Sequence, residues 1–473
     1  MVSREISISR FHSYLERNDM TRNPHQEEGI WWCVERELQL QKPDLESTLT
    51  ISKGGIVADE MGLGKTVLML GLTVVNFVRR TLIVVPLPLL SQWKREIKRT
   101  LGHDVLVYHG IERKHLTKEE LHDAPIVLTT YGGLKPKSKD NLYGIKWDRV
   151  IYDEAHHMRN SSSKKHFYGK LLRSKYKWLL TGTPVQNKIG DLFSLFHILG
   201  YKHKETINYE VFRKLREFHI IRRKKTDVGI DLPPVNIVNI NVDWKNKYEK
   251  EVSTKLHNLV ENKISTTDLP WLENIGERKI IQMIRAKQMC VCPRLLENKI
   301  RPMITKGILE KDYETILTST SKLDSVIKLI KEKHKNNNKK IVFCTFHEEI
   351  KTLKEKLNRE DITSVGIYSG RLNVRARQKI ISDDYTILLM QIQAGCEGLN
   401  LQQYNEIYFT TPHWNPCVED QAIGRCYRMG QKKETFVYHF NMETLSKEDK
   451  VHSMDEYVRN VQNDKRLLQE ELL

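Results

Sequence analysis

Short apolar runs recur along the chain, and each is followed by a polar loop and a stretch of helical composition. The first set is TLIVVP (81–86), DVLVYHG (104–110), PIVLTTY (125–131), DRVIYDEAH (148–156) and YKWLLTGTP (176–184). The second set is KKIVFCTF (339–346), SVGIYSG (364–370), YTILLMQI (385–392), EIYFTTP (406–412) and TFVYHFN (435–441). Strands that are apolar on both faces and alternate with helices indicate parallel sheets covered by helices. The interruption between the sets predicts two α/β domains.

The segment GGIVADEMGLGKTV (54–67) combines a strand, a glycine loop and the start of a helix. Backbone N–H groups and a helix N-terminus bind phosphate in this arrangement. The generic pattern G-x-x-x-x-G-K-[ST] would place a glycine at position 59, where this chain has Asp59. We expect Lys65 to reach the β- and γ-phosphates of a nucleotide and the Thr66 hydroxyl to bind Mg²⁺.

Two adjacent carboxylates, Asp153 and Glu154, end the apolar run 148–156. Ligands of parallel sheets bind at the carboxyl ends of the strands. Asp153 would hold Mg²⁺ through water, and Glu154 would orient and deprotonate the attacking water. Together with the glycine loop, this pair predicts a nucleotide hydrolase.

Two arginines, Arg425 and Arg428, lie three residues apart in QAIGRCYRMGQ (421–431). On a helix this spacing places them on one face. If that face meets another lobe across a cleft, they stabilise charge on the γ-phosphate as arginine fingers do. Without such context, a pair of arginines is usually a solvated face.

The balance of charges and cysteines limits the partners and the compartment. The formal net charge is +17, which favours a polyanionic partner, nucleic acid first and an anionic membrane surface second. The longest apolar run, 67–78, is too short for a membrane span, so we expect no membrane partner. The seven cysteines are scattered without a C-x-x-C pair, which favours a reducing, intracellular compartment.

These motifs, in this order, resemble the SWI/SNF-type branch of the superfamily-two helicases over about residues 20–450. In that branch the phosphate loop has the sequence D-E-M-G-L-G-K-T, so Asp59 matches the family's own form of the loop. HWNPCVEDQAIGRCYRMGQ (413–431) contains the W-N-P-x-x-E-x-Q-A pattern that is specific to this branch. We expect no added module beside these motifs. In this respect the chain resembles the compact members of the family that occur in large DNA viruses.

The resemblance implies roles for further residues. Gln26 would contact the adenine, and the nucleotide would be held by Gln26, Asp59, Glu60, Met61, Gly62, Leu63, Gly64, Lys65, Thr66 and Gln421. Nucleic acid would be contacted by Gln92, Trp93, Lys94, Thr129, Thr130, Ser369, Gly370, Gly395, Gly398, Asn400 and Trp414. The segment 180–187 would couple the two sites, and 221–234 resembles the inter-lobe linker.

The chain departs from the family pattern in three places, one of which is His157, since Arg or another polar residue is common after the acidic box. Cys396 and Glu397 stand where small or apolar residues are usual, which puts a nearby phosphate contact in doubt. The family's Asp-Pro-Trp-Trp is Thr411-Pro412-His413-Trp414 here, so one aromatic side chain is lost.

The fold implied is a pair of RecA-like parallel-sheet lobes joined by a helical linker with helical protrusions. We expect an N-terminal extension at 1–20, the first lobe at 21–200, and the protrusion and linker at 201–320. The second lobe would occupy 321–445, and a C-terminal helix at 446–473 would pack back.

The function implied is an ATP- and Mg²⁺-dependent translocase or remodeller acting as a monomer on double-stranded DNA, with little sequence preference. One alternative is a strand-separating DNA or RNA helicase, which needs a wedge element that the sequence does not reveal. Another is an ATP-gated clamp that holds DNA or a protein partner without stepping along it. The nucleus, a nucleoid, or a viral factory or virion would be the place of action.

Overall fold

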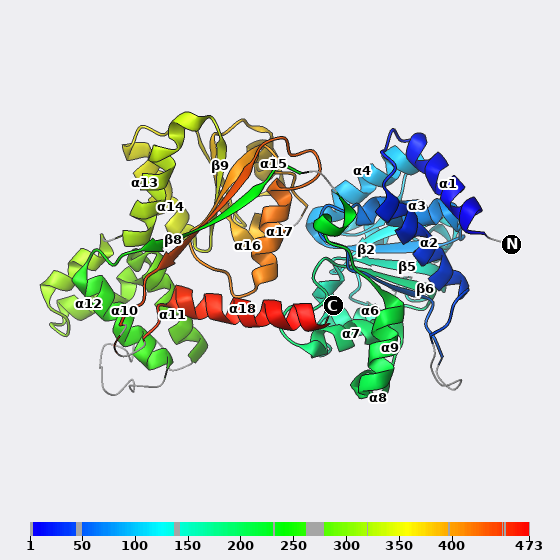
Figure 1. Cartoon of the computed structure of the whole chain (residues 1–473), viewed down its shortest axis with the longest axis horizontal. Coiled ribbons are helices and arrows are strands. Elements are labelled where there is room, and N and C mark those ends of the chain that lie inside the picture. The colour runs from blue at the N-terminus through cyan, green and yellow to red at the C-terminus, as the bar shows by residue number, and fades with distance from the viewer. Residues whose placement is uncertain are drawn as a thin grey trace. The chain divides into compact units, whose positions relative to one another are not determined.

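The computed structural model describes residues 3–43, 50–136, 142–229, 232–261, 279–318, 320–395, 398–446, 448 and 451–472. Its contacts divide the chain into two compact units. Unit 1 comprises Met1–Asp231 together with Leu468–Leu473, and unit 2 comprises Leu232–Leu467. Each unit is built around one parallel sheet (Figure 1).

The sheet of unit 1 has the strand order β3-β4-β2-β5-β6-β1-β7, and every neighbouring pair is parallel. Its strands are β1 (Gly54–Val57), β2 (Thr81–Val85), β3 (Leu106–Tyr108), β4 (Ile126–Thr130), β5 (Trp147–Asp153), β6 (Ser174–Leu180) and β7 (Ile220–Ile221). All the predicted apolar runs of this half form strands. The short β7 was not predicted.

Both faces of this sheet are buried, which explains why its strands are apolar throughout. Val57, Ile83 and Leu180 face a core shared with α1 (Arg4–Glu16), α2 (Pro24–Leu38), α3 (Lys65–Val75) and α4 (Leu90–Leu101). Their chain neighbours face the opposite core, built with α7 (Ile189–Leu199) and α9 (Tyr209–His219). The shorter helices α5 (Lys118–Asp123), α6 (Lys164–Leu171) and α8 (His203–Ile207) complete the unit.

The sheet of unit 2 has the order β10-β11-β9-β12-β13-β8 and is also parallel throughout. Its strands are β8 (Val235–Val242), β9 (Lys339–Cys344), β10 (Val365–Tyr368), β11 (Ile387–Gln391), β12 (Tyr404–Phe409) and β13 (Thr435–Met442). One face packs on α13 (Ser321–Glu332) and α14 (His347–Arg359), and the other on α15 (Val374–Ser382), α16 (Ile392–Gly395) and α17 (Pro416–Cys426). The predicted fold class, two α/β parallel-sheet lobes, is confirmed.

The segment predicted as a helical protrusion and linker, 201–320, needs one correction. Its helices α10 (Lys247–Val260), α11 (Lys279–Val291) and α12 (Glu297–Thr305) are present and share the core of α13 and α14. However, β8 pairs with β13 over all eight of its residues, so this part is an edge strand. The charged sequence around VNIVNINV obscured its β-branched residues, which favour strands.

The C-terminal stretch contains α18 (Met454–Leu472), the helix expected there. Met454 and Val458 on its first turns belong to the core of unit 2. No helix in the described ranges is long and apolar enough to cross a membrane.

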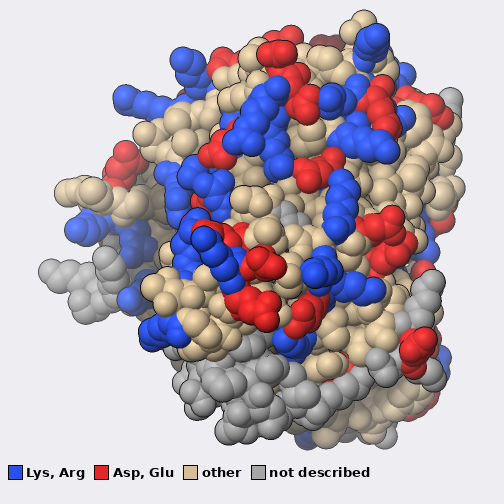
Figure 2. All heavy atoms as spheres, turned by 90° about the vertical axis from the view of Figure 1, so that its left-hand side faces the viewer, with Lys and Arg blue, Asp and Glu red and all other residues tan. Residues whose placement is uncertain are grey.

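The excess of Lys and Arg over Asp and Glu does not appear on every face of the molecule. Figure 2 faces the end of unit 2 that carries α10 and α12 and shows Lys and Arg interspersed with Asp and Glu. Pairs such as Arg301 with Glu297 and Glu314 account for part of this mixture. Such exposed pairs contribute little to stability, and this face offers no continuous basic track.

Candidate active site

Three adjacent strands of unit 1 end at the same level. Val57 of β1 and Asp153 of β5 both lie opposite Leu180 of β6 in the sheet register. The glycine loop, the carboxylate pair and the Thr181-Gly182-Thr183 segment therefore leave the sheet side by side. This is the edge where parallel sheets bind ligands.

The glycine loop is tightly packed on α2. Gly64 has φ +86°, and a Cβ there would lie 2.2 Å from Gln26 Nε2, so only glycine fits this position. Gln26 Nε2 donates to the Leu63 carbonyl at 3.3 Å. In this structure the Gln26 amide therefore supports the loop that Lys65 follows.

Asp59 forms a long-range ion pair. Arg223 donates from Nε to Asp59 Oδ1 at 3.0 Å and from Nη2 to Oδ2 at 2.5 Å. Backbone bonds extend this attachment: Ala58 N donates to Ile221 O at 2.8 Å, and Glu60 N to Arg223 O at 2.9 Å. The carboxylate that replaces the generic glycine anchors the loop to the segment after β7.

The Glu60 carboxylate is also engaged, because it accepts the backbone N–H of Lys225 at 2.8 Å. Lys65 Nζ donates to the carbonyls of Asp59 at 2.6 Å and Glu60 at 3.3 Å. The ammonium thus lies over the loop's own backbone, and Thr66 follows it at the start of α3. Gly62 adopts a left-handed φ, and Met61 is half-buried beside it.

The carboxylate of Asp153 is buried and firmly oriented. Trp93 Nε1 donates to Asp153 Oδ2 at 2.7 Å, and Glu154 N donates to Oδ1 at 3.0 Å. Burial, with the neighbouring Glu154 charge, raises the pKa of Asp153 to about 6. Trp93 was predicted to contact nucleic acid, but its indole lies inside the protein and orients this carboxylate.

Glu154 occupies the left-handed region at φ 49°, ψ 52°, which is unusual for a residue other than glycine. His156 Nδ1 lies 3.3 Å from Glu154 Oε2 and 3.4 Å from Thr181 Oγ1. The two carboxylates therefore have different partners, as the division of roles between them requires.

The arginine pair of unit 2 needs a correction. α17 ends at Cys426, and Tyr427 has ψ 86°, so Arg428 lies beyond the helix and does not share a helical face with Arg425. The two guanidinium groups still influence each other, because burial and the Arg425 charge lower the pKa of Arg428. Gln421 lies one turn before Arg425 on α17, and both are buried.

The residues predicted to contact nucleic acid differ in their exposure. Lys94, Gly370 and Asn400 are exposed, Gln92 and Trp414 are half-buried, and Trp93, Thr129, Thr130, Ser369 and Gly395 are buried. Thr129 Oγ1 donates to Tyr108 O at 2.8 Å, which joins β4 to β3. Gly398 has φ 77°. Cys396 and Glu397 lie outside the described residues.

The departures at Thr411 and His413 are structural. Thr411 Oγ1 donates to Asp455 Oδ1 at 3.2 Å, and His413 N donates to Glu419 Oε1 at 2.6 Å. Both contacts attach the loop after β12 to other parts of unit 2. The Thr411 hydroxyl therefore joins this loop to α18, and the His413 ring nitrogen Nδ1 lies 3.1 Å from Asn415 O. The contact of His413 N comes from the backbone and does not depend on the side chain.

Sequence reasoning missed Arg223 and His156 as parts of the site. Arg223 lies 164 positions from Asp59 in the sequence, and no local pattern joins them. His156 was visible as the fourth residue of Asp-Glu-Ala-His, but its contact with Thr181 depends on the neighbouring strand.

The donors at this edge fit Mg²⁺. A hydroxyl from Thr66 and a carboxylate from Asp153 are the hard oxygen ligands that Mg²⁺ takes, and this ion commonly uses only one or two protein ligands with waters and phosphates. No group of three or more His, Cys, Asp or Glu suited to a metal occurs in the described part of the chain. The six described cysteines are free and buried.

Comparison with known proteins places the chain in a family. The model of the SNF2-related domain matches residues 25–295, more than half of the chain, and that of the helicase conserved C-terminal domain matches 321–430. A probable global transactivator of Orgyia pseudotsugata multicapsid polyhedrosis virus is 28% identical over 93% of this chain and 89% of its own length.

Two other matches differ in how much of the matched protein this chain covers. The DNA repair protein RAD5B of Arabidopsis thaliana is 25% identical over 82% of this chain, which spans only 44% of that relative's length. The Sulfolobus solfataricus SWI2/SNF2 ATPase core in complex with dsDNA is 23% identical over 96% of both chains, with a TM-score of 0.41. The predictions of a helicase-type ATPase and of its family are confirmed: the chain belongs to the family of proteins with an SNF2-related domain.

Proposed function

We propose that this protein is an ATP-dependent translocase on double-stranded DNA. The observation that carries the proposal is the alignment of the phosphate loop, the Asp153–Glu154 pair and Thr181 at one sheet edge. It supplies phosphate-binding amides, a buried carboxylate and a differently oriented second carboxylate. These are the groups that phosphoryl transfer to water requires.

Within unit 1, each side chain has a separate task. Lys65 leaves the loop carbonyls and pairs with the β- and γ-phosphates of ATP. Glu154, held by His156, accepts the proton of the attacking water. Thr66 and Asp153 would hold Mg²⁺, which neutralises developing phosphate charge when bound.

Arg425 and Arg428 are proposed to add positive charge to the same nucleotide during turnover. We expect Arg425→Ala to lower kcat more than it weakens ATP binding. Arg375→Ala is a matched control, because Arg375 is an exposed arginine of α15. Equal losses in kcat and in ATP affinity for Arg425→Ala would contradict this role.

Double-stranded DNA is proposed as the track because the chain carries a net charge of +17 and belongs to this family. The related structure from Sulfolobus solfataricus is a complex with dsDNA, which agrees with this choice. Contacts to phosphates carry no sequence information, so binding should tolerate sequence and weaken steeply with salt. The free cysteines support a reducing compartment as the place of action.

The testing experiment is steady-state ATP hydrolysis without nucleic acid and with duplex DNA, single-stranded DNA or duplex RNA, at one salt concentration. Stimulation by duplex DNA, followed by ATP-dependent displacement of a triplex-forming strand, is the expected result. Stimulation mainly by single strands or RNA, with unwinding, would favour a helicase. Stimulation by duplex DNA without triplex displacement would favour a clamp.

A further inference from the structure

A cavity of about 690 Å³ lies on unit 1 beside the active site. Two segments line it: residues 157–165, which follow the carboxylate pair, and residues 187–194, which follow the Thr-Gly-Thr segment. No residue of the phosphate loop lines it. The cavity is therefore distinct from the place expected for the ATP phosphates.

The lining is strongly basic. It contains the cations Arg159, Lys164, Lys165 and Lys188 and a single carboxylate, Asp191. No salt bridge joins any of the four cations to an acidic side chain in the described part of the chain. Because like charges that line one cavity repel one another, an anion bound there would be favoured.

The single carboxylate offsets only one of the four positive charges, and its oxygen is engaged by the backbone. Asp191 Oδ2 accepts the backbone N–H groups of Gln186 at 3.1 Å, Asn187 at 2.7 Å and Lys188 at 3.4 Å. Asp191 is buried at the start of α7 and stabilises this turn. The positive charge of the cavity is therefore available to a ligand.

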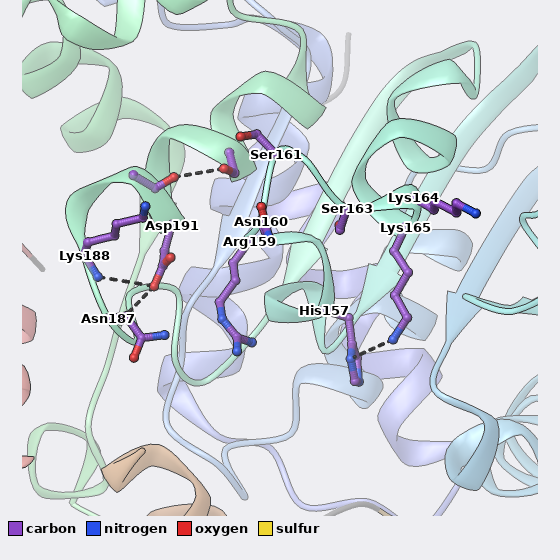
Figure 3. A pocket seen from close by; sticks show the side chains of 12 residues that line it. His157, Arg159, Asn160, Ser161, Ser163, Lys164, Lys165, Asn187, Lys188 and Asp191 are labelled. Atoms are coloured by element: carbon purple, nitrogen blue, oxygen red, sulfur yellow. Dashed lines mark hydrogen bonds between the residues drawn. The ribbon is translucent and has the colours of Figure 1, made fainter. Parts of the chain in front are cut away.

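The polar lining adds uncharged donors. Asn160, Ser161, Ser163 and Asn187 surround the cavity, and α6 begins in its wall after the N-cap Ser163. Figure 3 shows Arg159, His157 and Asn187 pointing to the same side, with Lys165 beside His157 and Lys164 turned away. Guanidinium, ammonium, hydroxyl and amide groups together are the donors that proteins use for phosphate.

We propose that this cavity binds a phosphate group, carried either by a nucleic-acid backbone or by a free phosphorylated small molecule. The lining of the cavity is connected to the proposed catalytic groups through His156. The ring of His157 stacks on His156 at 4.9 Å, and His156 lies 3.3 Å from Glu154 Oε2. On the other wall, Gln186, the neighbour of Asn187, donates to Thr183 Oγ1 at 3.0 Å.

The test is calorimetric titration of the full chain with tripolyphosphate, in the Lys65→Ala background so that the phosphate loop does not contribute. We expect one equivalent to bind. Adding Arg159→Gln and Lys165→Gln should weaken that binding at least about tenfold, because two charge-assisted contacts are lost. Adding Lys118→Gln and Lys204→Gln instead, two exposed lysines outside the cavity, should leave it unchanged.

Absence of binding in the Lys65→Ala background, or equal weakening by the cavity and control variants, would overturn the proposal. Should the Arg159 variant misfold, Lys165→Glu alone changes an exposed side chain and should cause the same loss. The proposal does not depend on translocation, because the measurement requires no turnover.

A second titration distinguishes the two sources of phosphate. The Lys65→Ala protein is first saturated with duplex DNA and then titrated with tripolyphosphate. Loss of tripolyphosphate binding would assign the cavity to the nucleic-acid backbone. Retention would assign it to a free phosphorylated molecule.

Discussion

Each unit holds a buried carboxylate at the carboxyl edge of its sheet, but the two carboxylates have different surroundings. In unit 1, Asp153 shares the strand end with Glu154, whose charge adds to burial in raising its pKa to about 6. In unit 2, Glu349 of α14 accepts the backbone N–H groups of Thr345 at 2.9 Å and Phe346 at 3.0 Å, and the Thr410 hydroxyl donates to it. Burial raises the pKa of Glu349 too, but these donors and the charge of Lys322 oppose the shift.

The difference separates the edge that we propose to be catalytic from a structural one. Two like charges held together destabilise the fold, and proteins retain such an arrangement where it serves chemistry. A carboxylate surrounded by donors instead ties a helix to a sheet. Burial and a raised pKa alone therefore do not identify a catalytic carboxylate, whereas its neighbours do.

The largest effect expected from this comparison is that of Glu154→Gln. Removing the proton acceptor should lower ATP turnover by about 10²- to 10⁴-fold, the usual contribution of a general base. The melting temperature should not fall, because glutamine is nearly the same size as glutamate and keeps an acceptor oxygen for His156 Nδ1, which lies 3.3 Å from Glu154 Oε2. Steady-state ATPase assays measure the turnover, and a thermal melt measures the stability. Near-normal turnover of Glu154→Gln would refute the assignment of Glu154 as the proton acceptor.

Arg223→Gln tests whether the phosphate loop depends on its anchor. The change leaves Asp59 buried without its ion-pair partner, which should cost about 3 kcal/mol of unfolding free energy. The KM for ATP should rise, since the loop loses its attachment to the segment after β7. Urea unfolding and ATPase kinetics measure both effects.

A matched double variant, Asp59→Asn with Arg223→Gln, should recover part of the lost stability because no unpaired charge remains. If the double variant is no more stable than Arg223→Gln alone, the ion pair is not the anchor.

The pH dependence of stability should reveal Asp153. Its folded pKa of about 6 lies above the ordinary value, so the native state binds the proton more tightly than the unfolded state. The unfolding free energy should therefore fall by up to about 3 kcal/mol as pH rises from about 4 to about 6. Asp153→Asn should remove this decrease, making the variant more stable than the wild type at pH 7.5 although inactive. Equal stability of the two proteins at pH 7.5 would contradict the raised pKa.

The smallest effect is expected for Glu349. Glu349→Ala leaves two partly buried backbone amides without an acceptor and should lower the unfolding free energy by about 2 kcal/mol. Turnover per folded molecule should stay within about twofold of the wild type. Glu349→Gln, which keeps an acceptor oxygen, should recover most of the stability. A large loss of turnover in either variant would contradict the distinction between the two sheet edges.

Much of the fold was predictable because parallel strands are apolar on both faces and read as short continuous runs. All ten such runs form strands. Lys65 and the Asp153–Glu154 pair were predictable because a strand, a loop and a helix in sequence bring them to one sheet edge. Arg428 was misplaced because the end of α17 depends on a local ψ angle that residue spacing does not reveal.

The sequence by itself determined two parallel-sheet units, a glycine loop between a strand and a helix, and a family, because these depend on residues close together in the chain. Only the tertiary structure decided that Arg223 anchors Asp59, that Trp93 orients Asp153, and that β8 completes the second sheet. It also assembled the basic cavity from two segments that follow neighbouring strands. Contacts between distant segments arise from packing and sheet register, and neither is encoded in any local stretch of residues.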